Sequence, residues 1–329
     1  MKTVMRCFIA FTAVFLLYVL TAGGVSAESP EASSSKADFS LLPEQPMFSA
    51  DVDVYRGQKR RQRISSGRVW ANAYYGDTTL KPKEGGKIDP SLYGLQVGFD
   101  LARSHGLFST FFLNINQSKV KFGEQFGSGT STVNNFLFGY GNFLYFNLCH
   151  LAFSGNIGYD RYEVSRNYDG TGDGMQVNFF TEFGLDFIFG QWAVKPFYGL
   201  QYDFLYHGKI GKSPPLYDDW NGHGFQQLVG LRVNWKPTDI LELQSRATWV
   251  HEMLGNPPPF YHARFSPMHG THTPAVMFHE GNTGRDWAWL GFGVKIECVY
   301  NVYLFLDYDA LLNGQHVTHL GSIGCCLGW

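Results

Sequence analysis

The chain has 329 residues, of which 17% are aromatic and only 16% charged, with 38 glycines and a formal net charge of −2. About a quarter of the residues are charged in an average soluble domain, so this composition is unusual for a soluble enzyme. The near-neutral charge gives no reason to expect a nucleic-acid partner. A mean hydropathy of −0.16 excludes a bundle of membrane-spanning helices and fits strands that are apolar on one face only.

Residues 1–27 have the pattern of a cleaved secretory signal peptide. Lys2 and Arg6 precede an apolar stretch, and the small residues of "GVSA" come before a cut expected after Ala27. The alternative is a transmembrane anchor, but the apolar run is about 16 residues long where a span needs about 20. Residues 28–65 form a polar, Ser- and Pro-containing segment that we expect to be a disordered linker, with the basic run "KRRQR" near its end.

From residue 66 to residue 329, apolar and polar residues alternate in twelve segments, which we predict to be β-strands. The segments are 66–76, 91–101, 106–116, 133–146, 149–164, 175–190, 191–207, 224–235, 240–253, 285–298, 301–312 and 316–329. In 240–253, for example, Leu241 and Leu243 alternate with Glu242 and Gln244. Such a strand suits lipid on one face and a hydrated lumen on the other, but a soluble sandwich would show the same alternation.

The lengths of the connections favour the membrane barrel. The long connections are 77–90, 117–132, 165–174, 208–223 and 254–284, and they alternate with short ones at 102–105, 147–148, 190–191, 236–239 and 299–300. Short turns at one end and long loops at the other are typical of outer-membrane barrels. The predicted fold class is therefore an all-β, antiparallel, twelve-stranded transmembrane β-barrel of the outer membrane, with its long loops outside the cell.

The polar faces of these strands carry charged side chains that we predict to line the lumen, as in other barrels of this class. The candidates are Asp100, Glu182, Asp186, Arg232, Glu242, Arg246, Lys295 and Asp309. Four cysteines outside the signal segment show no metal-binding spacing and are predicted to be residues of the barrel wall, with a disulfide as the alternative. They are Cys149, Cys298, Cys325 and Cys326.

Two groups of reactive residues do not predict a catalytic or metal site. One group has the residue types of an esterase site, namely His150, Ser154 and Asn156. Alternation points all three into the lumen with Asp160, whereas outer-membrane lipases need catalytic groups that face lipid. The connection 254–284 contains His262, His269, His272 and His279. No carboxylate or Cys has a supporting spacing, so these histidines are expected to be exposed loop residues. We predict no enzymatic activity, no cofactor and no metal.

Five short phrases of the sequence stand in a specific order. They are "YGLQVGFDLA" (93–102), "WVHEM" (249–253), "ARFSPMHGTHTPAVMFHEG" (263–281), "GRDWAWLGFGV" (284–294) and "YLFLDYDALLNGQHVTHLGSIGCCLGW" (303–329). In this order, residues 66–329 resemble the β-domain of autotransporters, the translocator of type V secretion. The resemblance implies a twelve-stranded barrel, inserted by the barrel assembly machinery, whose lumen holds a helix or linker from a preceding passenger. The passenger of such a protein reaches the cell surface through the barrel.

The sequence departs from that family on the N-terminal side. Only residues 28–65 separate the signal segment from the predicted barrel, too few for an adhesin or protease passenger, and they lack the Asn pair at which self-cleaving members cut. We expect a translocator-type barrel with no evident passenger, in which residues 47–65 plug the lumen by facing Arg and Lys toward its carboxylates. The alternatives are a stand-alone porin-like channel and a secreted soluble all-β protein.

The chain ends on "GSIGCCLGW", in which Ile323, Leu327 and Trp329 are predicted to face lipid. Such an ending resembles the C-terminal signal that the barrel assembly machinery reads. The last strand must pair with the first, near "VWANAYYG", because an open edge in the bilayer would leave backbone groups without hydrogen bonds. The expected partners are the lipid bilayer of the outer membrane and the assembly machinery, and the barrel is expected to be a monomer.

Overall fold

The computed structural model describes the chain from residue 67 onward, mostly as β-strands. The described residues are 67–80, 88–104, 107–122, 129–146, 148–165, 169–211, 218–255, 262–266, 275–279, 285–314 and 316–328. Within these ranges there is no helix with the length and apolar character needed to cross a membrane. The predicted signal peptide (1–27) and linker (28–65) lie outside the described residues and stay predictions.

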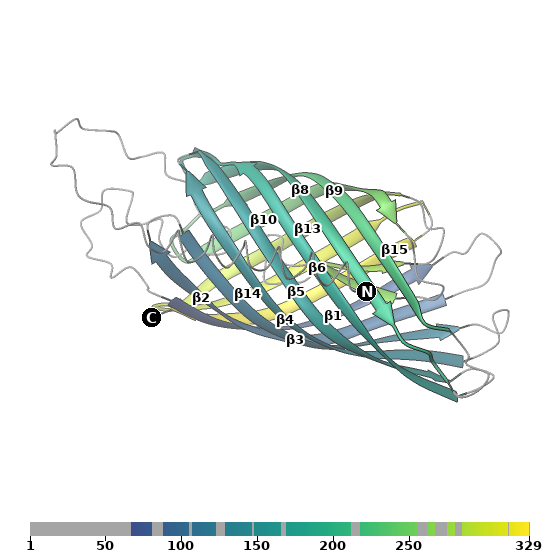
Figure 1. The fold of residues 1–329 in the computed structure, drawn as a ribbon. Coiled ribbons are helices and arrows are strands. Elements are labelled where there is room, and N and C mark those ends of the chain that lie inside the picture. Colours follow the sequence, from purple (N-terminus) through teal and green to yellow (C-terminus); the bar gives the residue numbers. More distant parts are fainter. Residues whose placement is uncertain are drawn as a thin grey trace. The chain divides into compact units, whose positions relative to one another are not determined.

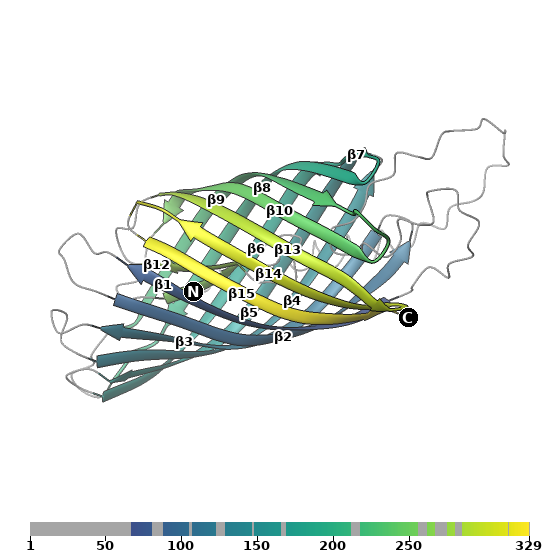
Figure 2. The same cartoon turned by 180° about the vertical axis from the view of Figure 1, so that it is seen from behind.

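The strands follow one another around a closed barrel (Figure 1). In chain order they are β1 (Gly67–Leu80), β2 (Ile88–Ser104), β3 (Leu107–Phe122), β4 (Gly129–Phe146), β5 (Cys149–Ser165), β6 (Asp169–Leu185), β7 (Phe187–Phe189), β8 (Trp192–His207), β9 (Trp220–Trp235), β10 (Leu241–Gly255), β11 (His262–Ser266), β12 (Ala275–His279), β13 (Asp286–Val299), β14 (Val302–Leu312) and β15 (His316–Gly328). Neighbours in the barrel are antiparallel, and β6 pairs with β8 to close it. With β7 continuing β6, the described strands form the predicted barrel of twelve (Figure 2).

The break between β6 and β7 has a local cause. Gly184 lies opposite Phe197 on β8, and Phe187 lies opposite Val194, so the register is the same on both sides of the break. Leu185 therefore stands opposite Pro196, which has no backbone N–H to donate to the ladder. The segment 175–190 was predicted as one strand, and the missing hydrogen bond accounts for the interruption.

The closing seam joins the two ends of the barrel sequence. β15 pairs with β1 from Arg68 opposite Gly328 to Leu80 opposite His316. On β15, Ile323 and Leu327 are exposed at 62% and 53%, whereas Ser322 is buried. The predicted pairing of the last strand with the first is confirmed, and Trp329 lies outside the described residues.

Burial along the strands separates the membrane barrel from the soluble sandwich. The apolar Leu95, Phe138 and Leu306 are about half exposed, at 50%, 47% and 57%, while the polar Asp100 and Asn135 are buried. A soluble protein would bury the apolar face instead. The alternative of a secreted soluble all-β protein is therefore wrong, and the inner face of the wall is the polar one.

The structure extends several strands beyond the predicted ends on the side of the long loops. β3 continues to Phe122 rather than residue 116, and β6 begins at Asp169 rather than residue 175. The outward residues there are polar, such as Lys121, because backbone pairing continues where an apolar face is no longer needed. The predicted loop 254–284 also contains strands, since β11 and β12 form a hairpin in it.

Candidate functional site

The inner wall holds the eight predicted lumen residues. Six are buried, namely Asp100, Glu182, Asp186, Arg232, Arg246 and Asp309. Glu242 and Lys295 are partly buried on β10 and β13. The structure does not bring the eight into one site, but distributes them over three groups on different parts of the wall.

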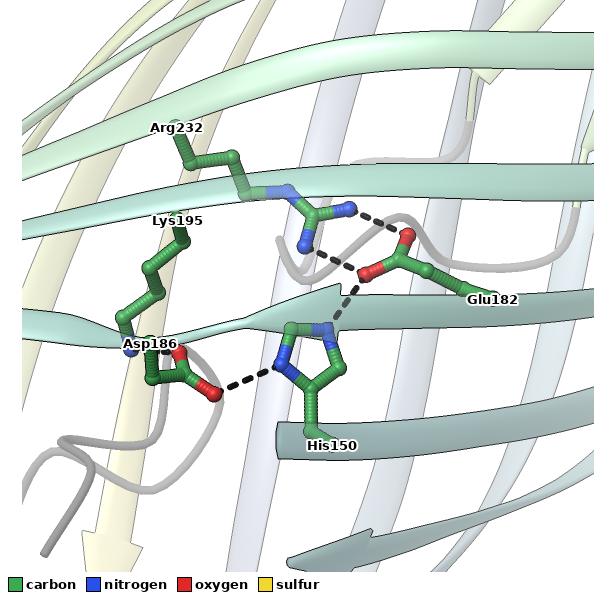
Figure 3. Close-up of polar contacts among 5 residues, drawn as sticks. All are labelled: His150, Glu182, Asp186, Lys195 and Arg232. Carbon is green, nitrogen blue, oxygen red and sulfur yellow. Dashed lines mark hydrogen bonds and ion pairs between the residues drawn. The ribbon is translucent and has the colours of Figure 1, made fainter. Parts of the chain in front are cut away.

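The largest group comes from β5, β6, β8 and β9, near the end of the barrel that carries the short turns. Figure 3 shows its five side chains. Nδ1 of His150 lies 2.7 Å from Oδ2 of Asp186, and Nε2 lies 2.9 Å from Oε1 of Glu182. Arg232 donates to both carboxylate oxygens of Glu182, at 2.6 Å and 2.5 Å. At the other side, Nζ of Lys195 lies 3.4 Å from Oδ1 of Asp186. We call these five buried residues the charge chain.

The geometry of the charge chain suits a protonated His150. A neutral imidazole has one N–H donor and one bare nitrogen, and the bare nitrogen would face an ionised carboxylate that has no proton to offer. Both ring nitrogens face carboxylates, and an imidazolium donates to both of them. Charges thus alternate from Lys195 to Arg232. Each buried charge has an opposite neighbour, which is the condition for burying charges at a tolerable cost.

The strands position these side chains through one glycine and one aromatic ring. His150 stands opposite Gly184 of β6, and a Cβ at Gly184 would lie 2.6 Å from Nε2 of the imidazole. Only glycine leaves room for the ring on this wall. Lys195 and Arg232 stand opposite each other, but each reaches its own carboxylate. The guanidinium of Arg232 also lies 4.0 Å above the ring of Phe197.

The second group joins three strands on another part of the wall. Arg246 of β10 forms an ion pair with Asp309 of β14, and Nε of Arg246 donates to Oδ1 at 2.8 Å. Trp289 of β13 donates from its indole to the same oxygen at 3.0 Å. A side chain at Gly291 would occupy the space of these groups, so the glycine makes this contact across β13 possible.

The third group surrounds Asp100 on β2. Oδ1 of Asp100 accepts hydrogen bonds from the hydroxyl of Thr110 at 2.5 Å and from the indole of Trp70 at 3.1 Å. Farther along the wall, Glu242 on β10 accepts a hydrogen bond from Asn234, and Nζ of Lys295 on β13 lies 4.5 Å above the ring of Tyr303. Like the other groups, this one holds strands together through buried polar contacts.

The esterase-like trio does not assemble in the structure. Both nitrogens of His150 are engaged by carboxylates, so the ring has no free nitrogen to accept a proton from Ser154. Among the described residues, no three His, Cys, Asp or Glu side chains are grouped as metal ligands. His262 and His279 stand opposite each other on the backbone of β11 and β12, and His269 and His272 lie outside the described residues.

Sequence reasoning missed the partnership of His150 and Lys195 with the predicted carboxylates. Alternation placed both side chains inward, but it does not give the register between strands. The signal was weak, because His150, Glu182 and Lys195 fall on three different segments and only the pairing of β5, β6 and β8 brings them together.

The four cysteines are free, as predicted, and Cys325 and Cys326 lie on opposite faces of β15.

A closed barrel with apolar side chains outside and buried charges inside defines the chain as an outer-membrane β-barrel protein. More narrowly, the family profile described as "Autotransporter beta-domain" matches residues 69–309, and the chain belongs to this family. It is an autotransporter translocator-type barrel of type V secretion, embedded in the lipid bilayer of the outer membrane. No curated protein matches the chain significantly.

The solved structures that share the fold include three autotransporter domains. The translocator domain of the autotransporter NalP from Neisseria meningitidis is 16% identical with a TM-score of 0.65, and the match covers 84% of this chain and 91% of that one. The β-domain of the Bordetella autotransporter BrkA is 14% identical with a TM-score of 0.60, covering 80% and 100%. The transport unit of AIDA-I from Escherichia coli is 12% identical with a TM-score of 0.58, covering 88% and 99%.

Proposed function

We propose that the barrel is a transport unit for the polypeptide that precedes β1, and that this polypeptide reaches the cell surface through the lumen. The observation that carries the proposal is the closed wall, whose outer face is apolar and whose inner face is polar. β1 begins at the end of the short turns, which is the periplasmic end in this class. A segment attached to Gly67 therefore has the lumen as its polar route across the membrane.

An epitope inserted between residues 28 and 46 tests this transport. We expect antibody to bind intact cells that express the full chain, and protease added outside to remove the epitope. The same epitope in the predicted turn 236–239 at the periplasmic end is the control, because it should stay inaccessible until the outer membrane is opened. Equal inaccessibility of both epitopes would contradict the transport.

Charge supports a second part of the proposal, that residues 47–65 plug the lumen. The buried inner wall described here has seven carboxylates, Asp100, Asp160, Glu182, Asp186, Asp203, Asp307 and Asp309, against Arg68, Lys195, Arg232, Arg246 and protonated His150. This is an excess of two negative charges, whereas residues 47–65 contain five Arg and Lys and two Asp. Opposite net charges favour the segment inside the barrel.

Single-channel conductance of the full chain and of a variant lacking 47–65 distinguishes a plugged barrel from an open one. We expect a small conductance for the full chain and a larger one after the deletion. A large conductance in both proteins would favour the porin-like channel instead, and unchanged small conductance would contradict the plug.

We also propose that the barrel assembly machinery recognises β15 and that the assembled barrel is a monomer without enzymatic activity. The support is that β15 forms the closing seam, with Ile323 and Leu327 exposed on its outer face. Together with Trp329 they would form the recognised signal. Replacing Leu327 by Asp should lower the amount of folded barrel in outer membranes. Normal assembly of that variant would contradict the recognition of β15. A cross-linked dimer of the parent protein would contradict the monomer.

A further inference from the structure

The inner wall carries a band of carboxamide side chains beyond the charge chain, toward the long loops. The band runs over neighbouring strands from β1 to β9 and is buried. Its members are Asn72, Gln96, Asn114, Asn116, Asn135, Asn156, Gln176, Asn178, Gln201 and Gln226. We call it the amide band. By contrast, the described inward residues of β13 and β14 include no carboxamide but several buried apolar ones, such as Trp287, Trp289 and Leu311.

The amide band is neutral apart from two carboxylates, Asp160 and Asp203, the second of which accepts a hydrogen bond from Gln201 at 2.8 Å. Asn116 donates to Asn135 at 2.9 Å, and Asn135 donates in turn to Asp160. Gln176 also donates to Asp160, at 3.1 Å. The buried Asp160 is thus held by neutral groups, and the inward Lys and Arg of the described strands lie closer to the short turns. A band of this kind binds hydrogen-bonding groups without selecting for charge.

Gln226 is the member of the amide band whose hydrogen-bonding capacity is unused. Its side chain is 0% exposed, and neither its amide oxygen nor its amide nitrogen has a partner in the described part of the chain. Oδ1 of Asn116 is also without a partner there. Buried polar atoms in proteins are normally paired, and each unpaired one needs an explanation. A binding partner that arrives in the lumen during function is such an explanation.

We propose that the amide band binds the main chain of a polypeptide in transit through the barrel. This inference rests on the proposed transport. A carboxamide offers the same donor and acceptor as a peptide group, so it pairs with a passing backbone whatever the side chains are. Neutral hydrogen bonds that replace bonds to water are individually weak, which allows repeated binding and release. Apolar side chains of the passing segment would contact the wall of β13 and β14.

The rate of transit tests the amide band, with a matched pair of variants. Gln226 and Gln227 are neighbours on β9, but Gln226 is buried on the inner face and Gln227 lies on the outer one. In the full chain with the epitope at 28–46, Gln226→Met should slow the appearance of the epitope on the surface by about threefold or more. Gln227→Met should leave that rate unchanged at an equal amount of folded barrel. Equal rates in the two variants would overturn the proposal.

A second measurement separates this inference from the proposed transport. A photo-reactive amino acid is placed at position 226 or at position 227 of the full chain, and cells are irradiated during synthesis. We expect cross-links from position 226, but not from 227, to the polypeptide preceding β1. Such cross-links without surface exposure would contradict the transport and retain the binding. Cross-links from position 226 to a glycan, or no cross-links at all, would overturn the amide band as a polypeptide site.

Discussion

The charge chain and the amide band lie on some of the same strands but differ in how their buried polar groups are paired. In the charge chain, every buried charge between Lys195 and Arg232 has an opposite charge beside it. In the amide band, Gln226 is equally buried but lacks a partner among the described residues. Paired charges fix a wall, whereas the two unpaired polar atoms of Gln226 have capacity left for a ligand. The comparison therefore assigns stability to the first region and recognition to the second.

The largest effect is expected from removing the central carboxylate of the charge chain. Glu182→Gln leaves the buried Arg232 and His150 without their shared anion, and breaking a buried ion pair costs about 3–5 kcal/mol. The measurement is the urea concentration at which the purified barrel loses its compact form on a gel. Glu163→Gln is the control, since it breaks an ion pair with Arg161 that is exposed on β5, with 3.6 Å between the charged atoms. Equal urea midpoints for both variants would show that the charge chain adds nothing to stability.

An intermediate effect is expected where a glycine makes room for the imidazole. Gly184→Ala places a methyl group against His150, and overpacking of this kind costs about 1–3 kcal/mol. Gly321→Ala on β15 is the control, because no atom lies within 4 Å of the position of its Cβ. The double variant Gly184→Ala with His150→Ala should cost less than the sum of the single changes, because the clash is gone. Additive costs would place the imidazole elsewhere.

How far sequence alone predicts these regions depends on the physical signal involved. Alternation places Glu182, Arg232 and Asp309 on the inner face, because a shift of one residue would move the apolar side chains of a strand to the inner face and its polar side chains to the outer face. It does not say which of them meet, since contacts across β5, β6 and β8 depend on register and on side-chain conformation. His150 was noticed in an esterase-like trio, and the structure places it between two carboxylates.

Other features carried too little signal to be predicted. The strands continue past the apolar stretches because hydrogen bonding of the backbone does not require apolar side chains, as at Lys121 on β3. Gln226 was overlooked because a single carboxamide in a strand does not differ from any other polar residue. Gln226 is distinguished only by being buried without a hydrogen-bond partner, and this can be recognised only in the structure of the folded barrel.

The smallest effect is expected on barrel stability when Gln226 is replaced, and the sign of that change distinguishes the amide band from the charge chain. Gln226→Met removes a buried carboxamide without a described partner, so barrel stability should stay equal or rise by up to about 1 kcal/mol. Asn135→Leu is the contrasting variant, since it removes bonds to Asn116 and Asp160 and should destabilise the barrel. Urea midpoints of both proteins check this. If Gln226→Met were as destabilising as Asn135→Leu, Gln226 would have a partner in the resting barrel and would not be held ready for a passing chain.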